Sequence, residues 1–154
     1  MTVKNEITET LRRLEKLMYG YNYEVTCGLD IFDNCGTIDA FQEQLNERYK
    51  KVKAEGFHPI LFDEAEFWEE VNFGLNYRGD DAAGLKLTTA KEEKLLNEQE
   101  RFKTFINNFI GGTTKIYSYP DELGIGGYEV YWGFTFLLLN VDKPSLLIYA
   151  SASD

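Results

Sequence analysis

The run YEVYWGFTFLLLN, residues 128–140, most constrains how this chain can fold. Large apolar side chains occupy every second position on one face of the run, which is the pattern of a β-strand. At the far end, Leu137 and Leu139 make the other face apolar as well, and a strand of that kind must be covered on both faces. The run therefore predicts a central strand. The turn at residues 142–144 then predicts SLLIYA, residues 145–150, as its antiparallel hairpin partner.

Apolar residues at helical spacing predict three or four helices. The expected helices are residues 3–19, a helix capped by Thr37 and ended by Gly56, one opened by Asp63 and Glu66, and one opened by Thr89 and Glu92 that runs to Gly111-Gly112. The last two starts have the spacing of capping boxes, in which an acid three residues after the cap hydrogen-bonds back to it.

Three further strands are expected. Residues 21–31 alternate without a break for eleven residues, with the odd positions facing the core. Residues 57–62 contain Pro59, which has no N–H for a ladder and indicates an edge strand. A short strand is expected at residues 114–119, and residues 76–88 read as a loop. The order predicts one α+β domain over residues 1–154, with a mostly antiparallel sheet and a central C-terminal hairpin.

The net charge restricts the partners of this protein. Sixteen basic residues oppose 26 acidic ones, which leaves a net charge of −10. That field repels nucleic acid and anionic membrane surfaces. A basic protein, a metal ion or a cationic ligand matches its sign, although acidity of this degree also serves solubility alone.

Several compartments and cofactors are not expected. The charged N-terminus does not read as a signal peptide, and the longest uncharged run, residues 130–141, is too short for the roughly 20 residues that span a bilayer. The two cysteines form no zinc motif and read as reduced thiols of a cytoplasmic, bacterial type of protein. The glycines of residues 124–127 lead into a strand rather than a helix, so we expect a turn and no bound cofactor.

The stretch GLDIFDNCG, residues 28–36, gathers polar side chains that invite a metal-site interpretation. Counted from Asp30 as the first calcium ligand, Phe32 stands third and Cys35 sixth, where an EF-hand loop needs an oxygen ligand and a glycine. We therefore expect no metal site, and we interpret the stretch as a strand end followed by a turn.

One enzyme hypothesis stays open. A cysteine nucleophile needs a base and an orienting acid, and His58 is the only histidine of the chain. Cys35, His58 and Asp63 would make such a set for a small hydrolase or transferase. Cys27 falls on the apolar face of its expected strand and is a weaker candidate than Cys35.

The segment DEAEFWEE, residues 63–70, carries five acids, no base and two large aromatics. On a helix, Glu66, Glu69 and Glu70 share one outer face, with Trp68 as an aromatic anchor. Asp80 and Asp81 in the following loop would extend the patch. These six residues are the predicted surface for a basic protein partner, and an ordinary solvated face is the alternative.

A ligand pocket lined by aromatics such as Tyr23, Trp132 or Phe134 is possible, with an ordinary core as its alternative. In size, acidity, mixed α+β order and lack of a catalytic set, the chain is similar to the small immunity proteins that neutralise bacterial toxins. That resemblance implies a non-catalytic binding protein, a neutraliser or an adaptor, which is our leading expectation.

Overall fold

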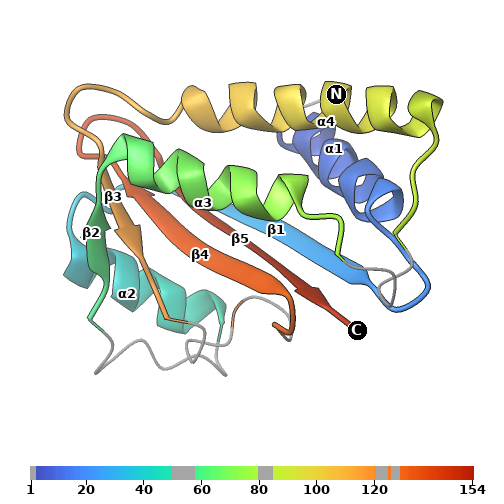
Figure 1. Ribbon diagram of the computed structural model, residues 1–154. Helices are drawn as coiled ribbons and strands as arrows, with labels where there is room; N and C mark the ends of the chain where they lie inside the picture. Colours follow the sequence, from blue (N-terminus) through green and yellow to red (C-terminus); the bar gives the residue numbers. More distant parts are fainter. Residues whose placement is uncertain (1–2, 50–57, 80–84, 121–124, 126–128) are drawn as a thin grey trace.

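The computed structural model describes residues 3–49, 58–79, 85–120, 125 and 129–154. Within these residues, four helices and five strands follow one another along the chain (Figure 1). They are α1 (Val3–Leu17), β1 (Glu24–Phe32), α2 (Ile38–Arg48), β2 (Ile60–Phe62), α3 (Glu64–Asn76), α4 (Thr89–Asn107), β3 (Lys115–Ser118), β4 (Trp132–Leu139) and β5 (Ser145–Ser153).

The strands form one antiparallel sheet in the order β1-β5-β4-β3-β2. The hairpin of β4 and β5 lies in the middle of the sheet, and β4 pairs with β5 from Trp132 to Leu138. On its other side β4 is paired with β3 only from Phe136 to Leu139. The edge strand expected within residues 57–62 is β2. The predicted α+β class, with a mostly antiparallel sheet and a central C-terminal hairpin, is confirmed.

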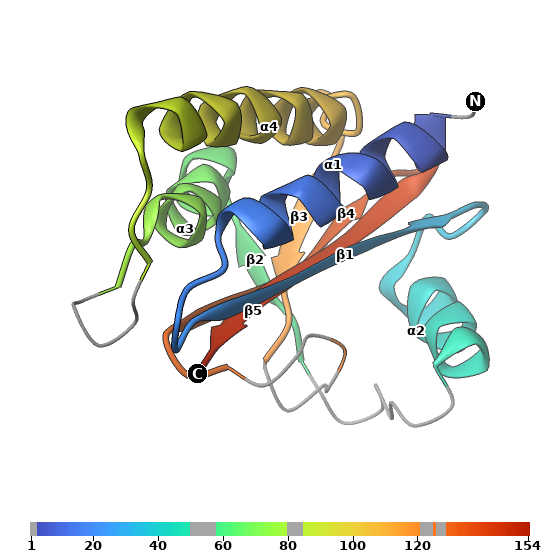
Figure 2. The same cartoon turned by 90° about the vertical axis from the view of Figure 1, so that its right-hand side faces the viewer.

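Helices cover both faces of this sheet. Three helices, α1, α3 and α4, lie over one face, and α2 lies against the other (Figures 1 and 2). β4 directs Trp132, Phe134 and Phe136 into the larger core beneath α1, α3 and α4. It directs Leu137 and Leu139 into a second core beneath α2. The two apolar faces predicted for this strand therefore have separate covers.

The first helix and strand are shorter than the sequence predicts. α1 ends at Leu17, and β1 begins at Glu24 rather than at Tyr21. Between them the N–H of Gly20 donates to the carbonyl of Tyr23 at 2.8 Å and closes a tight turn. Tyr21 sits in that turn with 94% of its surface exposed, so its expected inward position was wrong. Residue alternation alone does not reveal where a turn interrupts a strand.

The cap predicted for α2 is present. Thr37 accepts a hydrogen bond from the N–H of Ala40, and the helix ends at Arg48 with Tyr49 as its C-cap. The expected helix end at Gly56 and the first residue of the expected edge strand, Phe57, lie outside the described residues.

Of the two predicted capping boxes, the one at α3 is confirmed. The side chain of Asp63 accepts from the N–H of Glu66 at 2.7 Å, and Glu66 Oε1 accepts from the N–H of Asp63 at 3.0 Å. These reciprocal bonds satisfy two of the free N–H groups at the helix start. They also fix the first turn of α3, which carries part of the predicted acidic patch.

The box predicted at Thr89 and Glu92 was wrong by one residue. Thr88 is the N-cap of α4 and accepts from the N–H of Lys91, whose side chain cannot complete a box. The carboxylate of Glu92 pairs instead with Arg78, at 3.1 Å from its Nε. This ion pair joins the loop after α3 to the start of α4. Because the Glu92 carboxylate pairs with Arg78, it does not take part in a capping box.

Gly74 lets α3 approach the sheet closely. A Cβ placed on Gly74 would lie 2.6 Å from Cε3 of Trp132, closer than side-chain contacts allow. Behind the indole ring, Nε1 of Trp132 donates to the hydroxyl of Tyr23 at 2.6 Å. The indole ring of Trp132 is thus fixed by the hydrogen bond to Tyr23 on one side, and on the other side it packs directly on the backbone of α3 at Gly74.

We predict that Gly74→Ala destabilises the protein by roughly 1–3 kcal/mol because the added methyl overpacks this contact. Glycine to alanine within a helix otherwise stabilises by about 0.5–1 kcal/mol, so the sign of the change is informative. Urea unfolding measures the effect, and Asn76→Ala at the exposed end of the same helix is the control. Unchanged or increased stability of Gly74→Ala would contradict the close contact.

Candidate functional site

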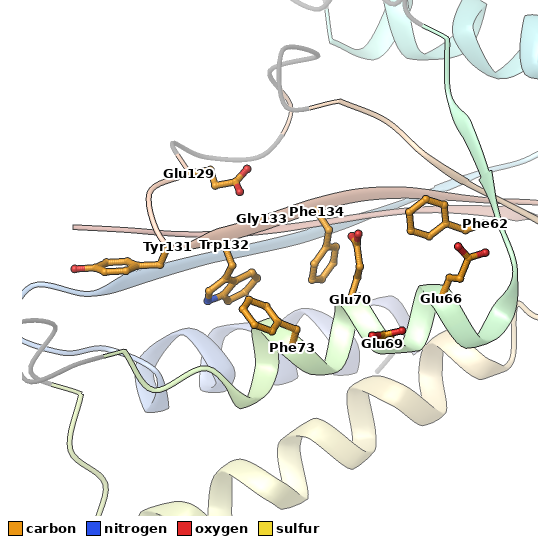
Figure 3. A pocket seen from close by; sticks show the side chains of 10 residues that line it. All are labelled: Phe62, Glu66, Glu69, Glu70, Phe73, Glu129, Tyr131, Trp132, Gly133 and Phe134. Atoms are coloured by element: carbon orange, nitrogen blue, oxygen red, sulfur yellow. The ribbon is translucent and has the colours of Figure 1, made fainter.

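A groove with a volume of about 530 Å³ lies between α3 and the first half of β4 (Figure 3). Its lining combines acidic and aromatic side chains. The lining residues are Phe62, Glu66, Glu69, Glu70, Phe73, Glu129, Tyr131, Trp132, Gly133 and Phe134. We call this set the acidic groove.

One wall of the acidic groove is a stripe on α3. Glu66, Glu69, Glu70 and Phe73 are spaced at i, i+3, i+4 and i+7, which places them on one side of a helix. The buried face of the same helix carries residues such as Phe67. Phe73 is 60% exposed and forms an aromatic rim. The wall is therefore acidic along its length and apolar at one end.

The floor of the groove consists of aromatic rings from β4. Trp132 and Phe134 are stacked, with ring centroids 5.9 Å apart, and both are at least 95% buried. Tyr23 lies behind this floor and is 1% exposed. Burial raises the pKa of Tyr23 to about 12, although the hydrogen bond from Trp132 opposes that shift. Of the three aromatics proposed for a ligand pocket, Trp132 and Phe134 line the groove and Tyr23 supports it.

Glu129 lies on the other side of β4 from α3 (Figure 3). Its carboxylate is against Gly133, where a Cβ would lie 2.8 Å from Oε2. The edge of β4 at Gly133 is thus flanked by carboxylates on both faces of the sheet.

The charge of the groove has one sign. None of the described residues that line it is basic. Across the part of the chain that the structure describes, no three His, Cys, Asp or Glu side chains converge as a metal site requires. The carboxylates of the groove are therefore spread along it rather than gathered at one point, which suits several separate positive charges better than one ion.

The predicted patch residues have different positions in the structure. Glu66, Glu69 and Glu70 line the groove together. Trp68 does not: it is half-buried, packs on the larger core and has its ring 4.9 Å from that of Phe67. The predicted extension through Asp80 and Asp81 lies outside the described residues.

The residues of the enzyme hypothesis are not brought together. Cys35 follows β1 and is 2% exposed, and its carbonyl accepts from Ser145 at the start of β5. His58 is exposed and precedes β2 at the opposite edge of the sheet. Four strand spacings separate β1 from β2, roughly 19 Å, which is far beyond hydrogen-bond range. The carboxylate of Asp63 caps α3.

The polar stretch around Asp30 is structural. The hydroxyl of Tyr49 donates to Oδ2 of Asp30, and Arg48 lies 3.9 Å from Oδ1. Asn34 has a φ of 55°, the left-handed conformation that asparagine tolerates in turns. These contacts join α2 to β1 and agree with the interpretation as a strand end and a turn.

Sequence reasoning missed half of the groove. Phe73 follows Glu66, Glu69 and Glu70 in their own helical stripe, so an extension of that pattern by one turn would have found it. Phe62, Glu129, Tyr131 and Gly133 come from other elements, and no local spacing links them to α3.

The comparisons with known proteins concern the fold. Two crystal structures of citrus MAF1, in different space groups, resemble this chain with TM-scores of 0.55 and 0.56 at 14% sequence identity. The similarity covers 94% of this chain and 97% or 99% of the crystallised MAF1 chains, so these chains share a fold. No protein-family model matches the sequence, and no curated protein matches it significantly.

No helix in the described part of the chain combines the length and the apolar character that a membrane crossing needs.

We predict that neither cysteine behaves as an activated thiol. Burial raises the pKa of Cys35, and it raises that of Cys27, where nearby Glu15 adds to the effect. A raised pKa leaves less thiolate at any pH below it, so reaction with a soluble disulfide reagent should stay slow at pH 8 and accelerate only above the ordinary value of about 8.5.

Single variants assign the result to each thiol. Cys27→Ala leaves only Cys35, and Cys35→Ala leaves only Cys27. Rapid modification of the Cys27→Ala variant at neutral pH, before unfolding, would contradict the structural position of Cys35 and revive the enzyme hypothesis.

Proposed function

We propose that this protein is a non-catalytic binding module whose acidic groove receives a positively charged segment of a partner protein. One observation carries the proposal. The groove joins four glutamates to an aromatic floor, and none of its described lining residues is basic. Charge then gives attraction and orientation, while the aromatics supply contact area.

The two kinds of side chain have separate roles in this proposal. The glutamates of α3 are exposed, so each contact with a cation contributes only about 0.2–1 kcal/mol, and their main effect is on the rate of association. Phe73 is the exposed aromatic next to them and is suited to anchor the alkyl stem of a lysine or arginine.

The sign and spread of the charges favour this class of partner over others. The overall charge of −10 and the acidic groove both oppose phosphate backbones. Carboxylates that are distributed along a groove match a polypeptide with several cationic residues. A neutraliser or an adaptor, acting in the cytoplasm without a cofactor, is the role that such a surface would serve.

The test uses a short synthetic peptide in which lysine alternates with valine. We predict that Glu69→Lys/Glu70→Lys weakens its binding roughly tenfold, because two charge reversals at exposed positions together change the free energy of binding by about 1.4 kcal/mol. Calorimetry or fluorescence anisotropy at low salt measures this change. Binding by the unmodified protein should also weaken as salt shortens the screening length below about 10 Å. Glu66 is kept because it belongs to the capping box.

Glu43→Lys/Glu47→Lys is the matched control. Both glutamates are exposed on α2, on the other face of the sheet, and both double variants change the net charge by four, from −10 to −6. The control should bind the peptide nearly as well as the unmodified protein, and urea unfolding checks that both variants fold. Equal losses in the two variants would mean that only net charge matters and that the groove is not the site.

A further inference from the structure

On the side of β3, the first half of β4 has no strand partner among the described residues, and we call this its open edge. β4 is eight residues long and β3 only four, and their pairing stops at Ser118 opposite Phe136. One further hydrogen bond, from the N–H of Tyr119 to the carbonyl of Thr135 at 2.9 Å, continues the ladder. Before Thr135, no described strand pairs with β4 on that side, and the acidic groove lies there.

The backbone of Gly133 faces this open edge. Backbone groups alternate in direction along a strand, so those of Gly133 point the same way as those of Thr135, toward the β3 side. An N–H and a carbonyl therefore face the groove in line with β3.

Side chains on both faces flank that edge. Toward α3 lie the aromatic floor and the glutamates of the helix, and on the other face lies Glu129 (Figure 3). α3 runs alongside β4 (Figure 1). Its glutamates recur about once per 5.4 Å turn, close to the roughly 6.8 Å between every second residue of an extended strand.

We infer that the acidic groove binds its partner as an added β-strand, paired with β4 at Gly133 in line with β3. The inference rests on the proposed function and specifies its partner: an extended segment with lysine or arginine at alternate positions, facing the glutamates of α3. Main-chain hydrogen bonds would supply affinity, and the charged and aromatic walls would supply selectivity.

The edge strand β2 is the competing place for such pairing. Ile60 and Leu61 are more than half exposed there. The groove at β4 is favoured because it supplies the charge complementarity that a cationic segment needs, from Glu69, Glu70 and Glu129.

The experiment compares the alternating lysine and valine peptide with two forms of it that carry N-methyl groups on the backbone. One form is methylated at every odd-numbered residue and the other at every even-numbered residue. A strand directs only alternate N–H groups toward its neighbour. One methylated form should therefore bind within about twofold of the parent peptide and the other at least tenfold more weakly. In parallel, binding of the parent should slow hydrogen exchange at the amide of Gly133, measured by NMR.

Equal affinities of the two methylated forms, or protection of Ile60–Phe62 instead of Gly133, would overturn pairing at β4. If the parent peptide binds and Glu69→Lys/Glu70→Lys weakens it, while the methylated forms bind alike, the proposed function stands and strand addition falls. If the parent peptide does not bind even at low salt, the proposed function fails as well.

Discussion

Burial of β4 on both faces is the constraint on which this structure depends. The strand places Phe134 and Phe136 in one core and Leu137 in another, and each is at least 95% buried. Burying a side chain of this size contributes about 1.5–3 kcal/mol, which neither face would gain if left to solvent. The chain therefore needs helices on both sides of the hairpin, and their two-sided arrangement follows from this one strand.

The acidic groove is a consequence of the same arrangement. β4 extends beyond β3, so its first half lacks a strand neighbour on that side among the described elements, while α3 still covers its aromatic face. Gly74 brings the helix close enough to press on Trp132. The outer stripe of α3, with Glu69 and Glu70, then stands beside an open strand edge. Acidic charge, aromatic surface and backbone groups meet where β4 has no strand partner among the described residues.

Much of the fold could be predicted from the sequence, but only part of the site. Periodicity identified the central hairpin, and the capping box of Asp63 and Glu66 marked the start of α3. The acidic side of that helix was visible because helical spacing is a local property. Trp68 was assigned to the surface, yet its ring packs on the core, because the rotation of a helix about its axis depends on what it packs against. No pattern in the sequence indicated that Glu129 would line the groove.

The sequence by itself determined the central two-faced strand, the α+β class, the net negative charge and the acidic stripe, since each depends on residue types at fixed local spacings. Only the tertiary structure decided which residues share a site. It joined that stripe to Trp132 and Glu129 and separated Cys35 from His58 by most of the sheet. The strand order and the unequal lengths of β3 and β4 determine which residues share a site. Both features arise from pairing and packing between segments that are distant in the chain.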